Sequence, residues 1–234
     1  MKYEDVVIPA DDVFLEGQLT IPEGAVGLVA FVHGSGSSRF SVRNQKVAGE
    51  LNEAGFATLL FDLLSPEEHE RDVITAEYRF SIPLLARRMG AAIEWLDLHD
   101  SVHAMPVGLF GASTGAAAAL IVAADHPGRV KAVVSRGGRP DLAEDALERV
   151  HAPTLLVVGG NDGPVIRLNR DAATHLACEH QLVIVPGASH LFEEPGKLDE
   201  VSELAADWFH RFLAPHPRLA QSGKRSAPGR RKGA

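Results

Sequence analysis

Short apolar segments alternate with longer amphipathic segments along most of this sequence, and the alternation restricts the fold more than any other feature. The apolar segments are nearly continuous in Val, Leu and Ile, which is typical of parallel strands covered on both faces. The longer segments have the pattern of crossover helices between such strands. We therefore predict an α/β fold with a mainly parallel sheet. The predicted buried strands are Gly27–His33, Ala57–Asp62, Val107–Ala112, Ala132–Ser135, Thr154–Gly159 and Leu182–Pro186, and the predicted helices are Asn44–Ala54, Ile82–Leu98, Thr114–Asp125, Val165–Leu176 and Leu198–Leu213.

Two segments depart from this alternation. Near the N-terminus, Asp5–Pro9 and Val13–Ile21 are separated by three residues, two of them aspartates, and this spacing predicts an antiparallel hairpin. The polar stretch Leu64–Ile82 is long for a connection between a strand and a helix. It is a candidate border of a ligand pocket, with no role assigned.

The chain has room for one large domain, which we place at residues 1–213, because 234 residues with 45% hydrophobic side chains can bury a substantial core. From Ala214 onward the sequence is rich in Pro, Gly and Ser and contains no acidic residue. We predict a basic, disordered tail at 214–234, and a solvated extension is the interpretation that we favour over an arm for nucleic acid or lipid. Its basic residues are Arg218, Lys224, Arg225, Arg230, Arg231 and Lys232.

Composition excludes several classes of function. The net charge of −8 argues against nucleic-acid binding by the core domain. The longest nearly apolar run, Ala116–Ala124, is too short to span a membrane. The single cysteine, Cys178, excludes an intramolecular disulfide, and the N-terminus lacks the pattern of a secretory signal, so we expect a cytoplasmic protein. We expect no metal, since clustered His and Cys ligands are missing, and oligomeric state is not predicted.

The most specific motif is Gly111-Ala-Ser113-Thr-Gly115, which directly follows a predicted strand and precedes a helix of small residues. In a chain with 22 glycines such a pentapeptide can arise by chance, but this context is the one that a nucleophile elbow requires. A sharp turn lifts the serine, and side chains at the two glycine positions would collide with neighbouring backbone. We predict Ser113 to be a nucleophile.

Two further strand ends carry matching side chains. Asp162 follows the strand Thr154–Gly159, and His190 follows the strand Leu182–Pro186. Because ligands of open α/β sheets bind at the carboxyl ends of strands, these positions converge on Ser113. A serine needs a base to take its proton, and the base needs a carboxylate to orient it. We expect a Ser113, Asp162, His190 triad, with Asp141 as the alternative acid.

An oxyanion hole is expected from two backbone amides. One is the amide of Thr114, which follows the nucleophile at the start of a helix, where amides are unpaired. The other comes from the loop His33-Gly-Ser-Gly36, with Ser35 as the first choice and Gly36 as the second. For His33 we favour a structural role in shaping this loop.

Several of these segments together resemble the dienelactone-hydrolase-like branch of the α/β-hydrolase superfamily. The resemblance covers the chain up to about Leu213 and implies an α/β-hydrolase fold with an eight-stranded sheet, no cofactor and no large lid domain. It is carried by Phe31–Arg39, the elbow, Val134–Leu142, Gly159–Asp162 and Gly187–Gly196.

The chain departs from that family at the nucleophile, because dienelactone hydrolases proper use a cysteine where this elbow has Ser113. We therefore expect a serine hydrolase that cleaves small carboxylic esters through an acyl-enzyme. The alternatives are a lactone or dienelactone hydrolase, an acyltransferase, and a non-catalytic protein that binds a ligand and retains the fold.

Four arginines follow strands near the expected site. The resemblance implies that an arginine holds a substrate carboxylate, and a guanidinium suits this task. In so acidic a chain, we favour salt bridging for each of the four. They are Arg39, Arg43, Arg136 and Arg139.

Overall fold

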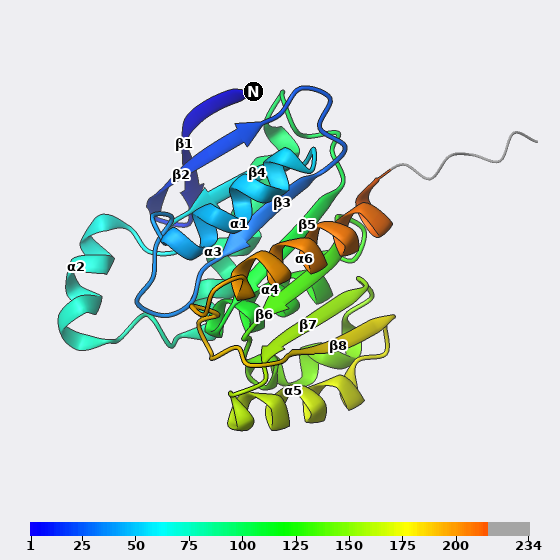
Figure 1. The fold of residues 1–234 in the computed structure, drawn as a ribbon. Coiled ribbons are helices and arrows are strands. Elements are labelled where there is room, and N and C mark those ends of the chain that lie inside the picture. Colours follow the sequence, from blue (N-terminus) through cyan, green and yellow to red (C-terminus); the bar gives the residue numbers. More distant parts are fainter. Residues whose placement is uncertain (215–234) are drawn as a thin grey trace, which may run out of the picture.

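One eight-stranded sheet organises the chain, with the strand order β1-β2-β4-β3-β5-β6-β7-β8 (Figure 1). The computed structural model describes residues 1–214, so the predicted tail lies, except for Ala214, outside the described residues. Strands β3 to β8 are parallel, whereas β1 pairs antiparallel with β2 and β2 antiparallel with β4. The predicted mainly parallel sheet and its entry hairpin are confirmed. The strands are β1 (Lys2–Ala10), β2 (Val13–Ile21), β3 (Leu28–Val32), β4 (Ala57–Phe61), β5 (Val107–Ala112), β6 (Val130–Arg136), β7 (Thr154–Gly159) and β8 (His180–Val185).

Burial follows the position of each strand in the sheet. Every residue of β3, β4, β5 and β7 is buried, because helices cover both faces of the central strands. Buried and exposed residues alternate in the second half of β1 and through β2, at the sheet edge where one face meets solvent. Ile8 of β1 pairs with Leu15 of β2, and both side chains are fully buried.

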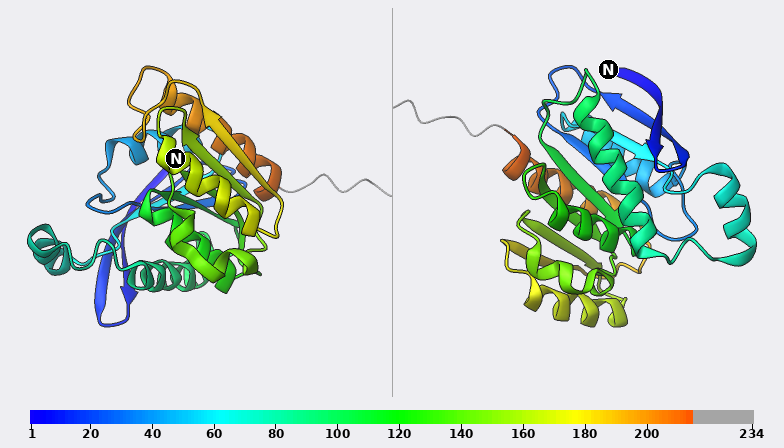
Figure 2. Two further views of the ribbon diagram at one scale, coloured as in Figure 1. Left: turned by 90° about the horizontal axis from the view of Figure 1, so that it is seen from below. Right: turned by 180° about the vertical axis from the view of Figure 1, so that it is seen from behind.

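The helices form two layers (Figures 1 and 2). Helices α1 (Val42–Glu53) and α6 (Lys197–Leu213) pack on one face, and α3 (Ile82–Leu98), α4 (Thr114–Asp125) and α5 (Gly163–His175) pack on the other. The connection from β3 to β4 moves along the sheet in one direction and the later crossovers move in the other. Because such crossovers are right-handed, α1 lies opposite α3, α4 and α5.

The reversal of direction creates a topological switch point at the carboxyl ends of β3 and β5, which are neighbours in the sheet. Open α/β sheets bind their ligands in the crevice at such a point. The loop after β3 begins with His33, and the turn after β5 carries Ser113. The fold therefore brings the two central parts of the expected site together.

Two helical segments were not predicted. Helix α2 (Pro66–Thr75) begins in the polar stretch after β4 and projects from the body of the molecule (Figure 1). Ser65 caps it, because the Ser65 hydroxyl accepts the amide of Glu68 while the Glu68 carboxylate accepts the amide of Ser65. A 3-10 segment, η1 (Pro140–Arg149), follows β6 and is interrupted at Glu144, where φ is +48°. Neither segment amounts to a lid domain. Within residues 1–214, no helix is both long and apolar enough to cross a membrane.

Candidate active site

The elbow after β5 holds Ser113 in a strained backbone conformation, with φ +51° and ψ −124°. Close packing explains both flanking glycines. A Cβ on Gly111 would lie 2.5 Å from the Cα of Ala116, and a Cβ on Gly115 would lie 2.1 Å from the carbonyl oxygen of Val32. A non-glycine residue at positive φ is uncommon and persists only where its surroundings enforce it.

Backbone hydrogen bonds fix the strained serine from both sides. The Ser113 amide donates to the carbonyl of Arg136 on the adjacent strand, at 3.2 Å. The Ser113 carbonyl accepts the amides of Ala116, at 3.1 Å, and Arg139, at 3.0 Å. The nucleophile candidate therefore stands on a backbone with little freedom, as a preorganised site requires.

His190 and Asp162 meet at the carboxyl edge of the sheet. His190 Nδ1 lies 2.6 Å from Asp162 Oδ2. The Asp162 side chain is only 12% exposed and caps α5 by accepting the Val165 amide, whereas His190 is 40% exposed. Because Nδ1 faces the carboxylate, Nε2 is the ring nitrogen left for a substrate or for Ser113.

A hydrogen bond to Glu194 and packing against Gly137 hold the turn that carries His190. The Glu194 carboxylate accepts the Ser189 amide at 3.0 and 3.1 Å, and this hydrogen bond lowers the pKa of Glu194 below its ordinary value. A Cβ on Gly137 would lie 3.6 Å from two ring atoms of His190. Gly137 follows the residue whose carbonyl holds the Ser113 amide, so the imidazole packs against the backbone beside the elbow.

The alternative acid, Asp141, has another partner. Its carboxylate pairs with the Arg139 guanidinium, with contacts of 2.7, 2.9 and 3.2 Å. Of the two candidate carboxylates, the structure brings only Asp162 to the imidazole of His190.

The loop after β3 lies directly against the elbow. A Cβ on Gly34 would lie 3.0 Å from the Cβ of Ser113, and the Ser35 amide donates to Thr114 Oγ1 at 2.9 Å. Thr114 is the first residue of α4, so its own amide has no acceptor within the helix. The two amides expected to form an oxyanion hole thus come from adjoining backbone segments.

His33 fixes the orientation of this loop. Its Nε2 accepts the Leu63 amide at 3.0 Å, which leaves Nδ1–H to donate to the Gly34 carbonyl at 3.0 Å. In a trans peptide the N–H points away from the C=O, so this bond also turns the Ser35 amide toward Thr114. Burial is the main cause that lowers the pKa of His33, and the imidazole is neutral. Both ring nitrogens are engaged in holding backbone, in agreement with the structural role expected for this side chain.

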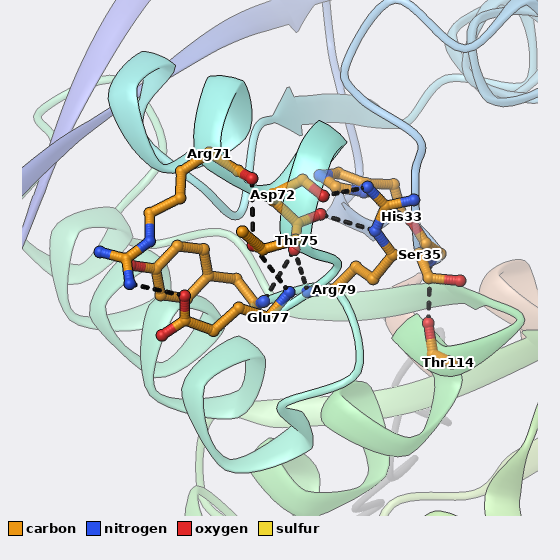
Figure 3. A network of polar contacts seen from close by, with 10 residues as sticks. His33, Ser35, Arg71, Asp72, Thr75, Glu77, Arg79 and Thr114 are labelled. Carbon is orange, nitrogen blue, oxygen red and sulfur yellow. Dashed lines mark hydrogen bonds and ion pairs between the residues drawn. The ribbon is translucent and has the colours of Figure 1, made fainter.

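The segment that contains α2 packs against the other side of the loop, as Figure 3 shows. Arg79 extends toward Gly36, with Nη1 3.6 Å from where a Cβ of that glycine would be. Asp72 holds Arg79 by accepting its Nε at 2.7 Å and its amide at 3.0 Å, and it also accepts the Tyr78 amide at 2.7 Å. Burial raises the pKa of Asp72, but these donors outweigh burial and hold the pKa below its ordinary value. Sequence reasoning missed both Asp72 and Arg79, and the Ser65–Glu68 capping box was the one local signal for α2, the helix that contains Asp72.

A cavity of about 290 Å³ opens between the loop after β3, which we expect to be the oxyanion loop, and the start of α2. His33, the first residue of the loop after β3, lines it, whereas Ser113 and His190 do not. Its walls mix polar and aromatic side chains. They include Ser37, Arg39, Phe40, Asp62, Leu64 and His69. Within the described chain, no cluster of three or more His, Cys, Asp or Glu side chains is arranged to hold a metal ion.

Salt bridging, the role that we favoured for the four arginines, is found for three of them. The expectation is wrong for Arg136: its side chain is buried, and among residues 1–214 it makes no ion pair. No local pattern in the sequence indicates this burial. The ion pairs of the others are Arg39 with Asp62 and Glu16, Arg43 with Glu193, and Arg139 with Asp141.

Comparison with known proteins shows the family to which the chain belongs. The model of the dienelactone hydrolase family matches residues 15–214. The chain belongs to the dienelactone hydrolase family. A solved structure of a dienelactone hydrolase from Anabaena variabilis is 54% identical, with a TM-score of 0.89, and the match covers 91% of this chain and 98% of that one. The α/β-hydrolase fold and the resemblance noted in the sequence are thereby confirmed.

Curated relatives carry two other names. A Mycobacterium tuberculosis protein, provisionally named a phosphoribosyl transferase, is 54% identical over 89% of this chain but only 46% of its own length. The chain thus spans about half the length of that relative. A Bradyrhizobium protein, provisionally named a 2-oxo-3-(5-oxofuran-2-ylidene)propanoate lactonase, is 31% identical over 63% of this chain and 66% of its own. Neither name defines the reaction of this hydrolase-family chain.

Proposed function

We propose that this hydrolase-family protein is a serine hydrolase that cleaves small carboxylic esters through an acyl-enzyme on Ser113. The observation that carries the proposal is the 2.6 Å contact between His190 Nδ1 and Asp162 Oδ2, together with a serine held at φ +51° in the elbow after β5. In this proposal, Ser113 is the nucleophile, His190 the general base and acid, and Asp162 the group that orients the imidazole and stabilises its charged form.

The proposed reaction has two steps. His190 Nε2 takes the proton of Ser113 as Oγ attacks the ester carbonyl, and the imidazolium then protonates the leaving alcohol. Water next gives a proton to His190 and attacks the acyl-enzyme, which releases the carboxylic acid and restores Ser113. The amides of Thr114 and Ser35 donate to the oxyanion in both steps. In the free enzyme the Ser35 amide donates to Thr114 Oγ1, and the oxyanion replaces that acceptor during the reaction.

The proposed substrates are small, as is the lactone named for the Bradyrhizobium relative. A lactone is an internal ester and follows the same chemistry. The names of the Anabaena and Bradyrhizobium relatives therefore make lactone hydrolysis the second candidate. We place the reaction in the cytoplasm, because the chain has a single cysteine and no disulfide.

A fluorophosphonate probe tests the nucleophile. Under native conditions we expect covalent labelling of the wild-type protein at Ser113 and none of Ser113→Ala. A folded wild-type protein that resists labelling would contradict the catalytic proposal and favour a non-catalytic ligand-binding protein.

A substrate panel then separates the candidate reactions. Esters of increasing acyl length and five-membered lactones are assayed with wild type and Ser113→Ala, and only activity lost in the variant belongs to this site. Product analysis in the presence of a competing alcohol distinguishes hydrolysis from acyl transfer: we expect the free acid as the main product. An ester of the added alcohol as the main product would instead identify an acyltransferase.

A further inference from the structure

Asn169 places a polar side chain in the middle of the buried face of α5. That face consists of Val165, Asn169 and Ala172, a spacing at which a helix ordinarily carries apolar side chains. Asn169 is 0% exposed. Burial of an amide group is unfavourable unless the group is hydrogen-bonded, so the hydrogen bonds of this side chain indicate its role.

The amide nitrogen of Asn169 donates to two backbone carbonyls. Nδ2 lies 2.9 Å from the carbonyl oxygen of Val165 and 2.9 Å from that of Gly138. Both partners are acceptors, so the nitrogen of the side-chain amide must face them. Val165 lies one turn earlier in the same helix, whereas Gly138 follows β6. The bond to Gly138 is therefore the one that ties α5 to another segment.

This bond fixes the orientation of one peptide group beside the elbow. The Gly138 carbonyl and the Arg139 amide belong to the same planar trans peptide and point in opposite directions. The carbonyl accepts Asn169 Nδ2, and the amide donates to the Ser113 carbonyl at 3.0 Å. A rotation of the peptide would weaken both hydrogen bonds.

The peptide is packed tightly against the elbow. A Cβ on Gly138 would lie 2.6 Å from the Cβ of Ala116 and 1.9 Å from Ser135 Oγ. Ala116 is in the first turn of α4, and its amide also donates to the Ser113 carbonyl. The peptide, this turn and the strained serine thus form one packed unit, to which Asn169 is bonded from α5.

Helix α5 carries the proposed catalytic acid at its start. Asp162 is the N-cap of α5, and its Oδ1 accepts the Val165 amide at 3.4 Å. Asn169 lies further along the same helix and donates to the Val165 carbonyl. The helix that positions Asp162 is therefore bonded, through Asn169, to the segment that positions Ser113.

We propose that Asn169 is a positioning residue, which fixes the nucleophile elbow relative to the Asp162–His190 pair. It acts through the Gly138–Arg139 peptide. A displacement of about 1 Å at a reacting group can cost 10²-fold in rate, so a peptide that turns away from the elbow lowers activity. The effect on catalysis rests on the proposed function, whereas the effect on the Arg139 amide does not.

Asn169→Leu tests the proposal, because leucine has nearly the same shape as asparagine and lacks the donor. The matched control is Asn52→Leu on α1. Asn52 is also buried, and its Nδ2 also makes two hydrogen bonds, to the Phe56 carbonyl at 2.9 Å and to Thr58 Oγ1 at 3.0 Å. These partners lie at the start of β4, whereas the proposed triad follows the carboxyl ends of strands. Both variants lose equivalent buried contacts, but only Asn169→Leu loses them beside the elbow.

Hydrolysis of a p-nitrophenyl ester gives the catalytic readout. We expect Asn169→Leu to lower kcat by about 10- to 100-fold and to keep KM within about threefold of wild type, because the nucleophile is displaced more than the bound substrate. Asn52→Leu should change kcat by less than about threefold. Equal losses of kcat in the two variants would show a general effect of stability and refute the positioning role.

Hydrogen exchange gives a readout that does not depend on catalysis. The exchange rate of the Arg139 amide is divided by that of the Val133 amide, which donates to the Pro153 carbonyl at 2.9 Å and reports the stability of β6. We expect this ratio to rise by about tenfold in Asn169→Leu and to stay at the wild-type value in Asn52→Leu. An unchanged ratio in a folded Asn169→Leu protein would refute the proposal.

Two further measures keep the test decisive. If leucine prevents folding, Asn169→Ala and Asn52→Ala are compared in the same way. Wild-type protein that a fluorophosphonate does not label would contradict the proposed function. The exchange ratio would then decide by itself whether Asn169 holds the elbow.

Discussion

His190 Nδ1 lies 2.6 Å from Asp162 Oδ2, while the nearby carboxylate of Asp141 is paired with Arg139. This difference predicts a large loss of activity in one of two isosteric variants and a small change in the other. Asp162→Asn should lower kcat by about 10³- to 10⁴-fold, because an amide at this position favours the wrong imidazole tautomer. Asp141→Asn should change kcat by less than about tenfold. Steady-state hydrolysis of a p-nitrophenyl ester measures both, and the reverse ranking would transfer the role of the acid to Asp141.

A substitution at Gly34 tests whether the position of the oxyanion loop affects catalysis independently of protein stability. A Cβ there would lie 3.0 Å from both the Ser113 Cβ and the Ala112 carbonyl oxygen. Gly34→Ala should push the loop and its Ser35 amide away from the elbow. We expect kcat to fall by about 10²-fold, as on loss of an oxyanion donor.

The control for this variant is Gly49→Ala on α1, where an added Cβ meets nothing within 4 Å. It should keep wild-type kcat and gain up to about 1 kcal/mol of stability, because alanine favours a helix over glycine. Chemical denaturation and ester hydrolysis are measured on both variants. Unchanged kcat in a folded Gly34→Ala protein would contradict the assignment of this loop.

Thr114 tests the hydrogen bond that holds the Ser35 amide in the free enzyme. Thr114→Val keeps the shape but removes the Oγ1 acceptor, which lies 2.9 Å from that amide. We expect kcat/KM to rise by up to about fivefold, because the oxyanion displaces this hydrogen bond during the reaction and the bond therefore stabilises only the free enzyme, by about 1 kcal/mol. Thr114→Ser retains the acceptor and should behave as wild type. A loss of kcat/KM in both variants would point to packing of the threonine methyl group instead.

His33 predicts a pH dependence of stability. Its pKa is lowered in the folded protein, mainly by burial, so below about pH 6.5 the unfolded chain binds the proton more readily. The free energy of unfolding of the wild type should therefore fall as pH decreases from about 6.5 to 5. His33→Asn removes this titration while it keeps a donor for the Gly34 carbonyl, and its slope over that range should be smaller. Urea denaturation at several pH values measures the slopes, with exposed His103→Asn as the control; parallel slopes for all three proteins would contradict a neutral, buried His33.

Sequence periodicity predicted the parallel strands, because strands buried on both faces leave a nearly continuous apolar pattern. It also predicted the helices that connect them, because these helices are amphipathic. Strand ends in turn predicted which residues would meet, and Asp162 does reach His190. Helix α2 was missed because most of its residues are polar, its side chains Val73 and Ile74 are exposed, and its packing depends on Asp72 and not on an apolar stripe. The burial of Arg136 was beyond prediction for another reason: the residue ends a strand, where no local pattern indicates that a charged side chain is buried.

Asp72 anchors the segment that carries α2 against the oxyanion loop, and its replacement gives the last prediction. Asp72→Asn should lower the free energy of unfolding by about 2–3 kcal/mol, since three donors lose a charged acceptor. The lowered pKa of Asp72 means that this stabilisation is present above about pH 4 and is lost as pH falls further. Because Arg79 would no longer be held beside Gly36, we also expect faster hydrogen exchange in residues 64–82. Glu77→Gln, in an exposed pair with Arg71, should change neither quantity; equal effects of the two variants would show that the anchor is not Asp72.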